Sequence, residues 1–208
     1  MKTIFLSKRK EVHEFRVGQT IFRQGDLAKN VMYIQEGVVK LTVVNEAGKE
    51  AVVAILGPGD LLGEACLAGL SICKETATAT TPAILFLIEK HEMARLLRAD
   101  RDFSDQFIDY LLAQKVRIDE DLTDQLLNSS EKRLAHVLLR LAGSGAPGNS
   151  QKALPNISQE MLAEMVGTTR SRVNFFMNRF RKLGFIQYGH GQRVPHVNKS
   201  LQSVVQQD

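Results

Sequence analysis

The stretch SQEMLAEMVGTTRSRVNFFMNRFRKL, residues 158–183, decides how the C-terminal part of this 208-residue chain is interpreted. Ser158 is a favourable helix N-cap for a first helix over Gln159–Val166. Ala163 is the small residue that a crossing second helix requires, and Gly167, four positions later, tolerates the positive φ of a tight turn. Because these features occur together and in register, they predict a helix-turn-helix.

The second helix, predicted over residues 169–183, has two different faces. Its apolar residues recur at i, i+3, i+4 and i+7, and together with Leu162 and Val166 they would lock the helix pair: Val173, Phe176, Met177 and Phe180. The opposite face is polar and basic, as a major-groove reader requires. We expect four of its residues to meet base edges: Arg170, Ser171, Asn174 and Phe175. Six others are better placed for DNA phosphates: Thr169, Arg172, Arg179, Arg181, Lys182 and Arg193.

Phe175 and the segment after the second helix carry further expectations. A Phe175 exposed on this face would either touch a thymine methyl group or pack under a neighbouring loop. Residues 184–188 and 193–194 flank a Gly-His-Gly turn and predict a small hairpin, the wing of a winged helix. The wing would bring Arg193 or His190 near the DNA backbone, although His190 is more often a solvated turn residue.

Charge is distributed unevenly along the chain. Residues 129–208 contain 11 Lys/Arg and 4 Asp/Glu, a net charge of +7, whereas residues 1–128 contain 16 and 19, a net charge of −3. A basic small domain beside an acidic larger one favours nucleic-acid binding by the C-terminal part. The alternative is a solvated basic surface without a partner.

The first 90 residues are typical of short strands separated by turns. Asn45-Glu46-Ala47-Gly48 predicts a hairpin loop, and Gly57-Pro58-Gly59-Asp60 a forced turn. The β-rich runs cover residues 31–34, 38–44, 51–56 and 83–88. We therefore predict an α+β chain with an N-terminal antiparallel β-roll, jelly-roll-like, a long dimerisation helix and a C-terminal winged helix-turn-helix domain. The expected domains are residues 1–100, 101–128 and 129–208.

Helical patterns begin after Lys90, over residues 92–97 and 103–127. In the longer segment four apolar residues and Lys115 are spaced 3, 4, 3, 4, as along a coiled-coil seam. The apolar four are Ile108, Leu111, Ile118 and Leu122. This seam would pack against a twin helix in a parallel dimer, against its own β-domain, or against both on different faces. Asn128 is the expected N-cap of the next helix, with Glu131 at the third position, and a candidate hinge.

Several classes of protein are disfavoured. Residues 1–10 do not resemble a secretory signal, and no run approaches the roughly 20 apolar residues that span a bilayer, so we expect a cytoplasmic protein without a membrane partner. A cupin-like metalloenzyme needs several histidines on its roll, and residues 11–89 contain only His13. No metal site and no enzymatic activity are predicted.

The order of roll, long helix and winged helix resembles the family of the cyclic AMP receptor protein and the fumarate–nitrate reductase regulator (CRP/FNR). The resemblance is carried by residues 59–64 (GDLLGE), residues 76–79 (TATA) and residues 158–183. It implies a homodimer on a pseudo-palindromic double-stranded operator, with half-sites about 34–36 Å apart, a docking geometry that is general to helix-turn-helix dimers. It also implies an effector that binds the roll against the long helix and sets the orientation of the DNA-binding heads. RNA polymerase is a further candidate partner.

The effector candidates depart from the pattern of cyclic-nucleotide binders. By the resemblance they are Gly63, Glu64, Lys74, Glu75 and Thr76. Relatives that bind a cyclic nucleotide place an Arg shortly before the Thr-Ala-Thr-Ala strand, whereas this chain has Lys74 and Glu75 there. A Glu repels a phosphate, and a Lys lacks the bidentate fork, so cyclic AMP is disfavoured as a high-affinity ligand.

Other effectors are constrained by the cysteines and histidines. The chain has no N-terminal cysteine cluster, so an iron–sulfur centre is not expected. Cys66 and Cys73 are interpreted as buried apolar residues, with a thiol redox pair as the alternative. Haem ligation by His13 or His91 stays open.

The family's familiar members carry Arg-Glu-x-x-x-Arg at the start of the recognition helix, where this chain has Arg170, Ser171 and Phe175. The operator should therefore differ from the best-known one. The sequence favours a homodimeric, effector-modulated transcriptional regulator. The alternatives are a constitutive DNA binder without a ligand, and a small-molecule-binding module that acts through protein contacts.

Overall fold

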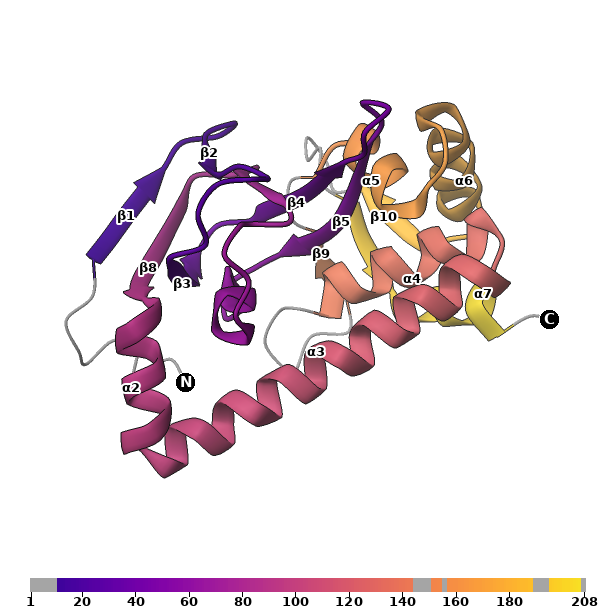
Figure 1. Ribbon diagram of the computed structural model, residues 1–208. Helices are drawn as coiled ribbons and strands as arrows, with labels where there is room; N and C mark the ends of the chain where they lie inside the picture. Colours follow the sequence, from indigo (N-terminus) through magenta and orange to yellow (C-terminus); the bar gives the residue numbers. More distant parts are fainter. Residues whose placement is uncertain (1–10, 144–150, 155–156, 189–194, 207–208) are drawn as a thin grey trace. The chain divides into compact units, whose positions relative to one another are not determined.

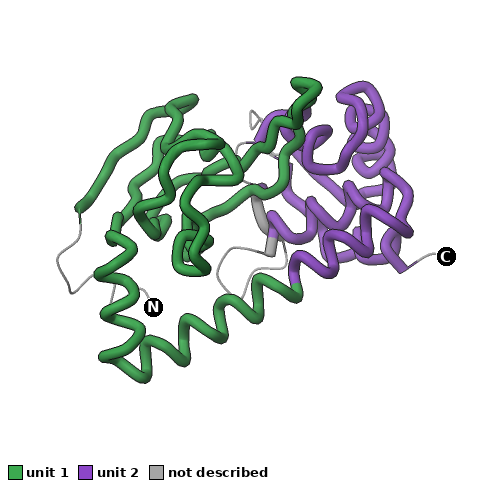
Figure 2. Tube along the Cα trace, in the orientation of Figure 1, with its two compact units in different colours: residues 1–116 green, residues 117–208 purple. Residues whose placement is uncertain are grey.

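The structure is a computed structural model that describes residues 11–143, 151–154, 157–188 and 195–206 (Figure 1). The chain forms two compact units, Met1–Val116 and residues 117–208 (Figure 2), and each is described by itself. The boundary between them lies inside the longest helix, α3 (Arg101–Leu127).

The first unit contains two antiparallel four-stranded sheets. One has the order β1-β8-β3-β6, and the other the order β2-β7-β4-β5. The strands of the first sheet are β1 (Glu11–Phe15), β8 (Ala83–Glu89), β3 (Asn30–Glu36) and β6 (Leu61–Leu62). Those of the second are β2 (Thr20–Phe22), β7 (Thr76–Ala79), β4 (Val39–Val44) and β5 (Glu50–Leu56). The predicted antiparallel roll is thus confirmed.

The two sheets of the roll share one apolar core. Met32, Ile34 and Leu85 come from the first sheet, and Val39 and Ala77 from the second; all five belong to the same buried cluster. Alternation along the strands explains this arrangement, because successive side chains point to opposite faces of a sheet.

Both turns predicted from glycine are present. In the β4–β5 hairpin the Asn45 N–H donates to the Lys49 carbonyl at 3.1 Å, and Gly48 has φ 76°. In the Gly57–Asp60 turn, the Asp60 carboxylate accepts the Gly57 N–H at 2.8 Å, and Gly59 has φ 100°. Positive φ explains why glycine occupies these positions.

Helices complete the first unit. The chain enters the short helix η1 (Glu64–Ala68) after β6, and α2 (Lys90–Ala99) follows β8 directly. Phe103 and Phe107 of α3 are buried in a second core with Tyr33, Phe86 and Met93. The first turns of α3 therefore belong to the roll, which the helix covers with one face.

The second unit is a winged helix. It contains α4 (Ser130–Gly143), β9 (Gln151–Ala153), α5 (Gln159–Val166), α6 (Arg170–Lys182), β10 (Ile186–Tyr188), β11 (Pro195–Asn198), η2 (Lys199–Leu201) and α7 (Gln202–Gln206). A hairpin is formed by β10 and β11: its first strand lies within the predicted residues 184–188, whereas the predicted second arm, residues 193–194, lies outside the described residues and the observed strand is Pro195–Asn198. An unpredicted third strand, β9, completes the order β10-β11-β9. Its three residues are too short to show an alternating pattern.

The predicted N-cap at Asn128 is wrong. The Asn128 N–H still donates to the Asp124 carbonyl at 3.1 Å, so Asn128 continues the hydrogen bonding of α3. Its side-chain amide also donates to the Asp124 carboxylate, at 2.6 Å. Ser129 is the residue that caps α4, because its hydroxyl accepts the Lys132 N–H at 3.3 Å.

Candidate nucleic-acid interface

The helix-turn-helix is formed as its local signals predict. Ser158 caps α5 by accepting the Met161 N–H at 3.1 Å, and Gly167 ends the helix in the left-handed region with φ 66° and ψ 46°. Thr169 caps α6, since its hydroxyl accepts the Arg172 N–H at 3.3 Å. Thr169 was predicted as a phosphate contact, and in the structure its hydroxyl starts the recognition helix.

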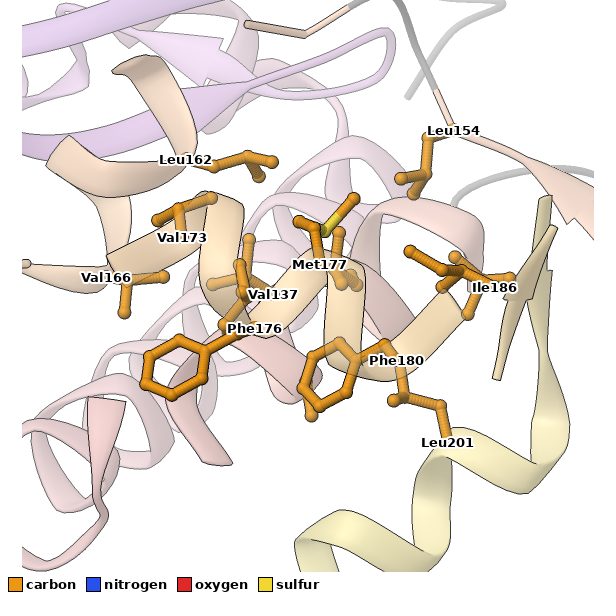
Figure 3. Close-up of a cluster of buried hydrophobic side chains, with 14 of the residues drawn as sticks. Val137, Leu154, Leu162, Val166, Val173, Phe176, Met177, Phe180, Ile186 and Leu201 are labelled. Atoms are coloured by element: carbon orange, nitrogen blue, oxygen red, sulfur yellow. The ribbon is translucent and has the colours of Figure 1, made fainter. Parts of the chain in front are cut away.

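The inner face of α6 packs as expected. Val173, Phe176, Met177 and Phe180 are all buried, together with Leu162, Ala163 and Val166 of α5. Figure 3 shows these side chains, apart from that of Ala163, in one cluster with Leu154, Ile186 and Leu201 from the rest of the unit. This core fixes the rotation of α6 about its axis and so determines which residues face outward.

The outward face of α6 is basic and contains no acid. The 13 residues of the helix include five Lys/Arg and no Asp/Glu. The four predicted base-reading residues are exposed: Arg170, Ser171, Asn174 and Phe175. The predicted phosphate contacts Arg172, Arg179, Arg181 and Lys182 are exposed as well. Arg193 and His190 lie outside the described residues.

Two of the exposed arginines are paired with acids from other helices. The Arg170 Nε lies 2.9 Å from the Glu160 Oε1 of α5, and the Arg179 Nη1 lies 2.9 Å from the Glu131 Oε2 of α4. Because both pairs are substantially exposed, water screens them and they restrain the side chains only weakly. The Glu160 contact involves Nε, and a guanidinium has five N–H donors, so Arg170 can bind a further acceptor.

The sequence reasoning missed both acids. Their signal was present, because Glu160 and Glu131 each stand in the first turn of a helix. The sequence does not show how α5 and α4 cross α6, and this crossing is what brings the two acids to the arginines.

Arg133 anchors the helix-turn-helix to the junction of α3 and α4. Its Nε donates to the Val166 carbonyl at 2.9 Å, and its Nη1 donates to the Asn128 carbonyl at 3.0 Å. One planar guanidinium thus satisfies carbonyls at the ends of two helices, which are otherwise left without an intrahelical donor. The sequence analysis did not assign a role to Arg133.

Two of the candidate effector residues, Gly63 and Glu64, form the turn between β6 and η1. Gly63 has φ 78°, and a Cβ added there would lie 2.5 Å from the Asn30 carbonyl oxygen, so only glycine fits. Glu64 follows directly. Burial raises the pKa of its carboxyl, a backbone hydrogen bond opposes this rise, and the negative charge of Glu75 adds to it.

The other candidates contribute little positive charge to this region. Lys74 is exposed, whereas Glu75 is half-buried and acts electrostatically on Glu64. The Thr76 hydroxyl accepts the Gln24 N–H at 3.0 Å at the start of β7. Glu64 and Glu75 place two acids in this region, where Lys90 also acts on Cys66 with a positive charge, and the two acids are unfavourable for a phosphate.

The two cysteines differ in burial. Cys66 is completely buried, as predicted, but Cys73 is only half-buried; both are free thiols. Burial raises the pKa of each thiol, and for Cys73 the charges of Asp26 and Glu75 raise it further. A raised pKa lowers the fraction of reactive thiolate at neutral pH.

Tyr110 of α3 contacts this same turn, and the sequence analysis missed it. Its hydroxyl accepts the Leu61 N–H at 2.8 Å, two residues before Gly63, and the Gln114 amide donates to that hydroxyl at 2.6 Å. Tyr110 continues the buried face of Phe103 and Phe107 at helical spacing. The contact joins the long helix to the backbone of the effector region.

The predicted seam of α3 is exposed within the chain. Ile108, Leu111, Ile118 and Leu122 are between 39% and 64% exposed. Leu112, Val116, Leu126 and Leu127 add to the exposed apolar surface of the same helix. Packing on its own roll therefore uses Phe103, Phe107 and Tyr110 and leaves the seam uncovered.

Among the residues that the structure describes, no helix combines the length and the apolar character needed to cross a bilayer. Within the same described ranges, no group of three or more His, Cys, Asp or Glu gathers in a way that could hold a metal ion.

Two family models match the chain. The model of the cyclic nucleotide-binding domain matches residues 12–100, and that of the Crp-like helix-turn-helix domain matches residues 132–199. They coincide with the roll and with the winged helix.

The chain is also similar to individual proteins. It is 30% identical over 176 residues to the cyclic AMP receptor protein of Thermus thermophilus, which covers 84% of this chain and 78% of that protein. It is 25% identical over 184 residues to the CRP-like cAMP-activated global transcriptional regulator of Mycobacterium tuberculosis, covering 88% and 82%. The structure of FixK2 from Bradyrhizobium japonicum has a TM-score of 0.82 at 16% identity, covering 97% of this chain and 98% of that one, which supports the fold. Winged helix, roll and these similarities agree, and the chain belongs to the CRP/FNR family of DNA-binding transcriptional regulators and not to a family of enzymes.

Proposed function

We propose that this regulator is a homodimer that reads a pseudo-palindromic operator through α6 and responds to an effector bound on the roll near Gly63 and Glu64. The observation that carries the proposal is the outward face of α6, with five basic residues, no acid and a rotation fixed by a buried core. Such a face binds phosphates at its edges and presents polar side chains to base edges between them.

The exposed seam of α3 supports the homodimer. A 27-residue helix with a row of apolar side chains left uncovered by its own roll gains stability by packing against an identical helix. A parallel pair would present two α6 helices related by two-fold symmetry, which matches a palindromic duplex.

The assignment of individual residues follows from their place on α6. Arg170, Ser171, Asn174 and Phe175 are the proposed base readers. The proposed phosphate contacts are Arg172, Arg179, Arg181, Lys182 and Arg193, with Thr169 contributing as the cap of the helix. RNA polymerase is a further partner that we expect of such a regulator.

The effector is proposed to be a ligand other than high-affinity cyclic AMP, although both sequence relatives carry cyclic AMP in their names. The acidic pair Glu64 and Glu75 disfavours a phosphate, and Lys74 offers a single exposed charge without a guanidinium fork. Tyr110 supports a coupling between the effector region and the long helix. A ligand that moves the Leu61–Gly63 turn would act on α3 through the hydroxyl of Tyr110, which accepts the Leu61 N–H.

The proposal is tested by selecting duplexes from a random pool with the full-length chain at fixed salt. We expect an enriched two-fold symmetric sequence whose affinity falls steeply as salt rises. Titration with cyclic AMP up to 100 µM should leave the affinity unchanged, and a ligand identified by mass spectrometry of the purified protein should change it. An asymmetric site or no enriched sequence would refute the dimeric reader. Tight, cooperative activation by cyclic AMP would refute the effector assignment.

A further inference from the structure

Phe175 is the unusual residue on the outward face of α6. It is 62% exposed, and within α6, all of which is described, no other large apolar side chain is exposed. Within the part of the chain that the structure describes, Phe175 is therefore not packed under a loop. Its ring stands edge-on to Phe176 at a centroid distance of 5.6 Å, and Phe176 is buried.

The position of Phe175 on the helix indicates what it meets. Of the proposed phosphate contacts, Arg172 lies in the first turn of α6, and Arg181 and Lys182 lie in the last. If both ends of the helix bind phosphates, the middle of its outward face enters the groove between them. In the major groove the thymine 5-methyl group is the apolar feature of the base edges, and it is the group that a Phe side chain contacts.

Asn174 stands beside Phe175 with an amide suited to adenine. Its Oδ1 accepts the Asn178 Nδ2 at 3.3 Å, one helical turn away. A carbonyl oxygen has two lone pairs, so this contact leaves an acceptor for adenine N6 while the Asn174 amide N–H₂ donates to N7. The neighbouring side chain on the same face thus favours the same class of base pair.

We propose that Phe175 reads a thymine methyl group and Asn174 an adjacent adenine, so that the middle of each half-site is specified as A·T pairs. This rests on the proposed function, since it assumes that α6 enters a major groove. Arg170 then reads the outer part of the half-site, with Glu160 as its acidic neighbour.

The experiment removes the methyl group from the DNA and leaves everything else in place. In the selected operator each thymine of the half-site is replaced in turn by deoxyuridine, which keeps the pairing and the O4 acceptor. At one of these positions the substitution should lower the affinity of the wild-type protein about fourfold, which is the contribution of one buried methyl-sized group. When the substitution is made in both half-sites, the affinity should fall about fifteenfold. F175A should bind the thymine and the deoxyuridine operators equally.

Three further measurements make the result specific. F175L keeps an apolar side chain, so its thymine preference should be partly retained. At the same position, replacing the pair by 5-methylcytosine·guanine should bind the wild-type protein more tightly than unmethylated cytosine·guanine. N174A should relax the preference for adenine at the neighbouring pair and leave the deoxyuridine effect intact. The midpoint of thermal unfolding of F175A should match that of the wild type, because the side chain is exposed.

The outcomes are distinguishable. An operator that is bound specifically but is indifferent to deoxyuridine at every thymine, or equally affected in F175A, would overturn the assignment of Phe175 and leave the proposed function intact. A selected half-site without thymine would do the same. If no sequence is enriched, the proposed function itself fails, and this assignment with it.

Discussion

The outward face of α6 and the turn at Gly63 and Glu64 are the two regions through which this regulator would meet its ligands, and they are built in opposite ways. The outward side chains of α6 lie in solvent and include five cationic residues, and the helix is held from behind by a buried core. At the turn, the acid Glu64 is half-buried, and a second acid, Glu75, acts on it electrostatically. The first region presents charge for a large polyanion, whereas the second is unfavourable for anions.

This difference explains why the family resemblance is informative about DNA and uninformative about the effector. DNA presents phosphates to every regulator of the family, so a basic helix face is required whatever the operator. A small ligand imposes no such common demand.

The largest expected effect concerns the seam of α3, because the proposed dimer with its two DNA-binding domains depends on it. Replacing Ile118 and Leu122 by Asp should convert the protein to a monomer, because two buried negative charges would face their symmetry mates. Loss of the second DNA-binding head should weaken operator binding by about a hundredfold or more. Sedimentation velocity and mobility shift check both effects.

A matched control is A113D, which places the same charge on an exposed position of α3 away from the seam. It should stay dimeric and bind DNA normally. A double Asp variant that remains dimeric would show that the seam does not form the interface.

The next effect separates base reading from phosphate binding on α6. R170A should lose about 1–3 kcal/mol of discrimination at one base pair of the half-site, whereas R172A should weaken binding to all sequences and reduce the salt slope by about one. Binding to a panel of single-substitution operators at two salt concentrations distinguishes them. Equal loss on every operator for both variants would remove Arg170 from the base readers.

A smaller effect is expected at Tyr110, which joins the turn to α3. Y110F removes the acceptor of the Leu61 N–H, and an unsatisfied buried N–H costs about 1–3 kcal/mol. Urea unfolding of the full chain should show this loss, and the change in DNA affinity caused by the effector should shrink. Q114A, which removes the donor to the same hydroxyl but leaves the Leu61 bond, is the control. If Y110F keeps the full effector response, the coupling runs through other contacts.

The smallest effect tests the acidic character of the effector region. Burial raises the pKa of Glu64 in the folded state, so its contribution to stability is fully present at low pH and is lost as the pH rises through that raised pKa. E64Q does not titrate and should therefore be slightly more stable than the wild type at pH 7, with the difference closing toward pH 3. Thermal unfolding at a series of pH values measures this difference. A destabilised E64Q at pH 7 would mean that the ionised carboxylate is favourably paired.

The comparison of the two regions also separates what the sequence predicted from what it did not. The helix-turn-helix was predicted in detail because its determinants are local: the Ser158 cap, the Gly167 turn and the apolar spacing of α6 all lie within 26 residues. The strands β3, β4, β5 and β8 were predicted for the same reason, from β-rich runs, of which the first three lie between glycines and the last follows Pro82.

Features that depend on distant partners were missed. The two residues of β6 are a strand only because they pair with Met32 and Tyr33 of β3. Tyr110 binds a backbone N–H that is 49 positions away, and the partner of Arg179 is 48 positions away. The N-cap at Asn128 was misassigned because its N–H still bonds to the last turn of α3, and the neighbouring Ser129 caps α4 instead.

The central claim is that two chains place two α6 helices on one symmetric operator. The most direct test is native mass spectrometry of the full-length protein on its selected duplex, combined with hydroxyl-radical footprinting of both strands. The account predicts two chains per duplex and two protected half-sites, related by two-fold symmetry, whose centres lie about 34–36 Å apart. One chain per duplex, or a single protected half-site at saturation, would contradict it.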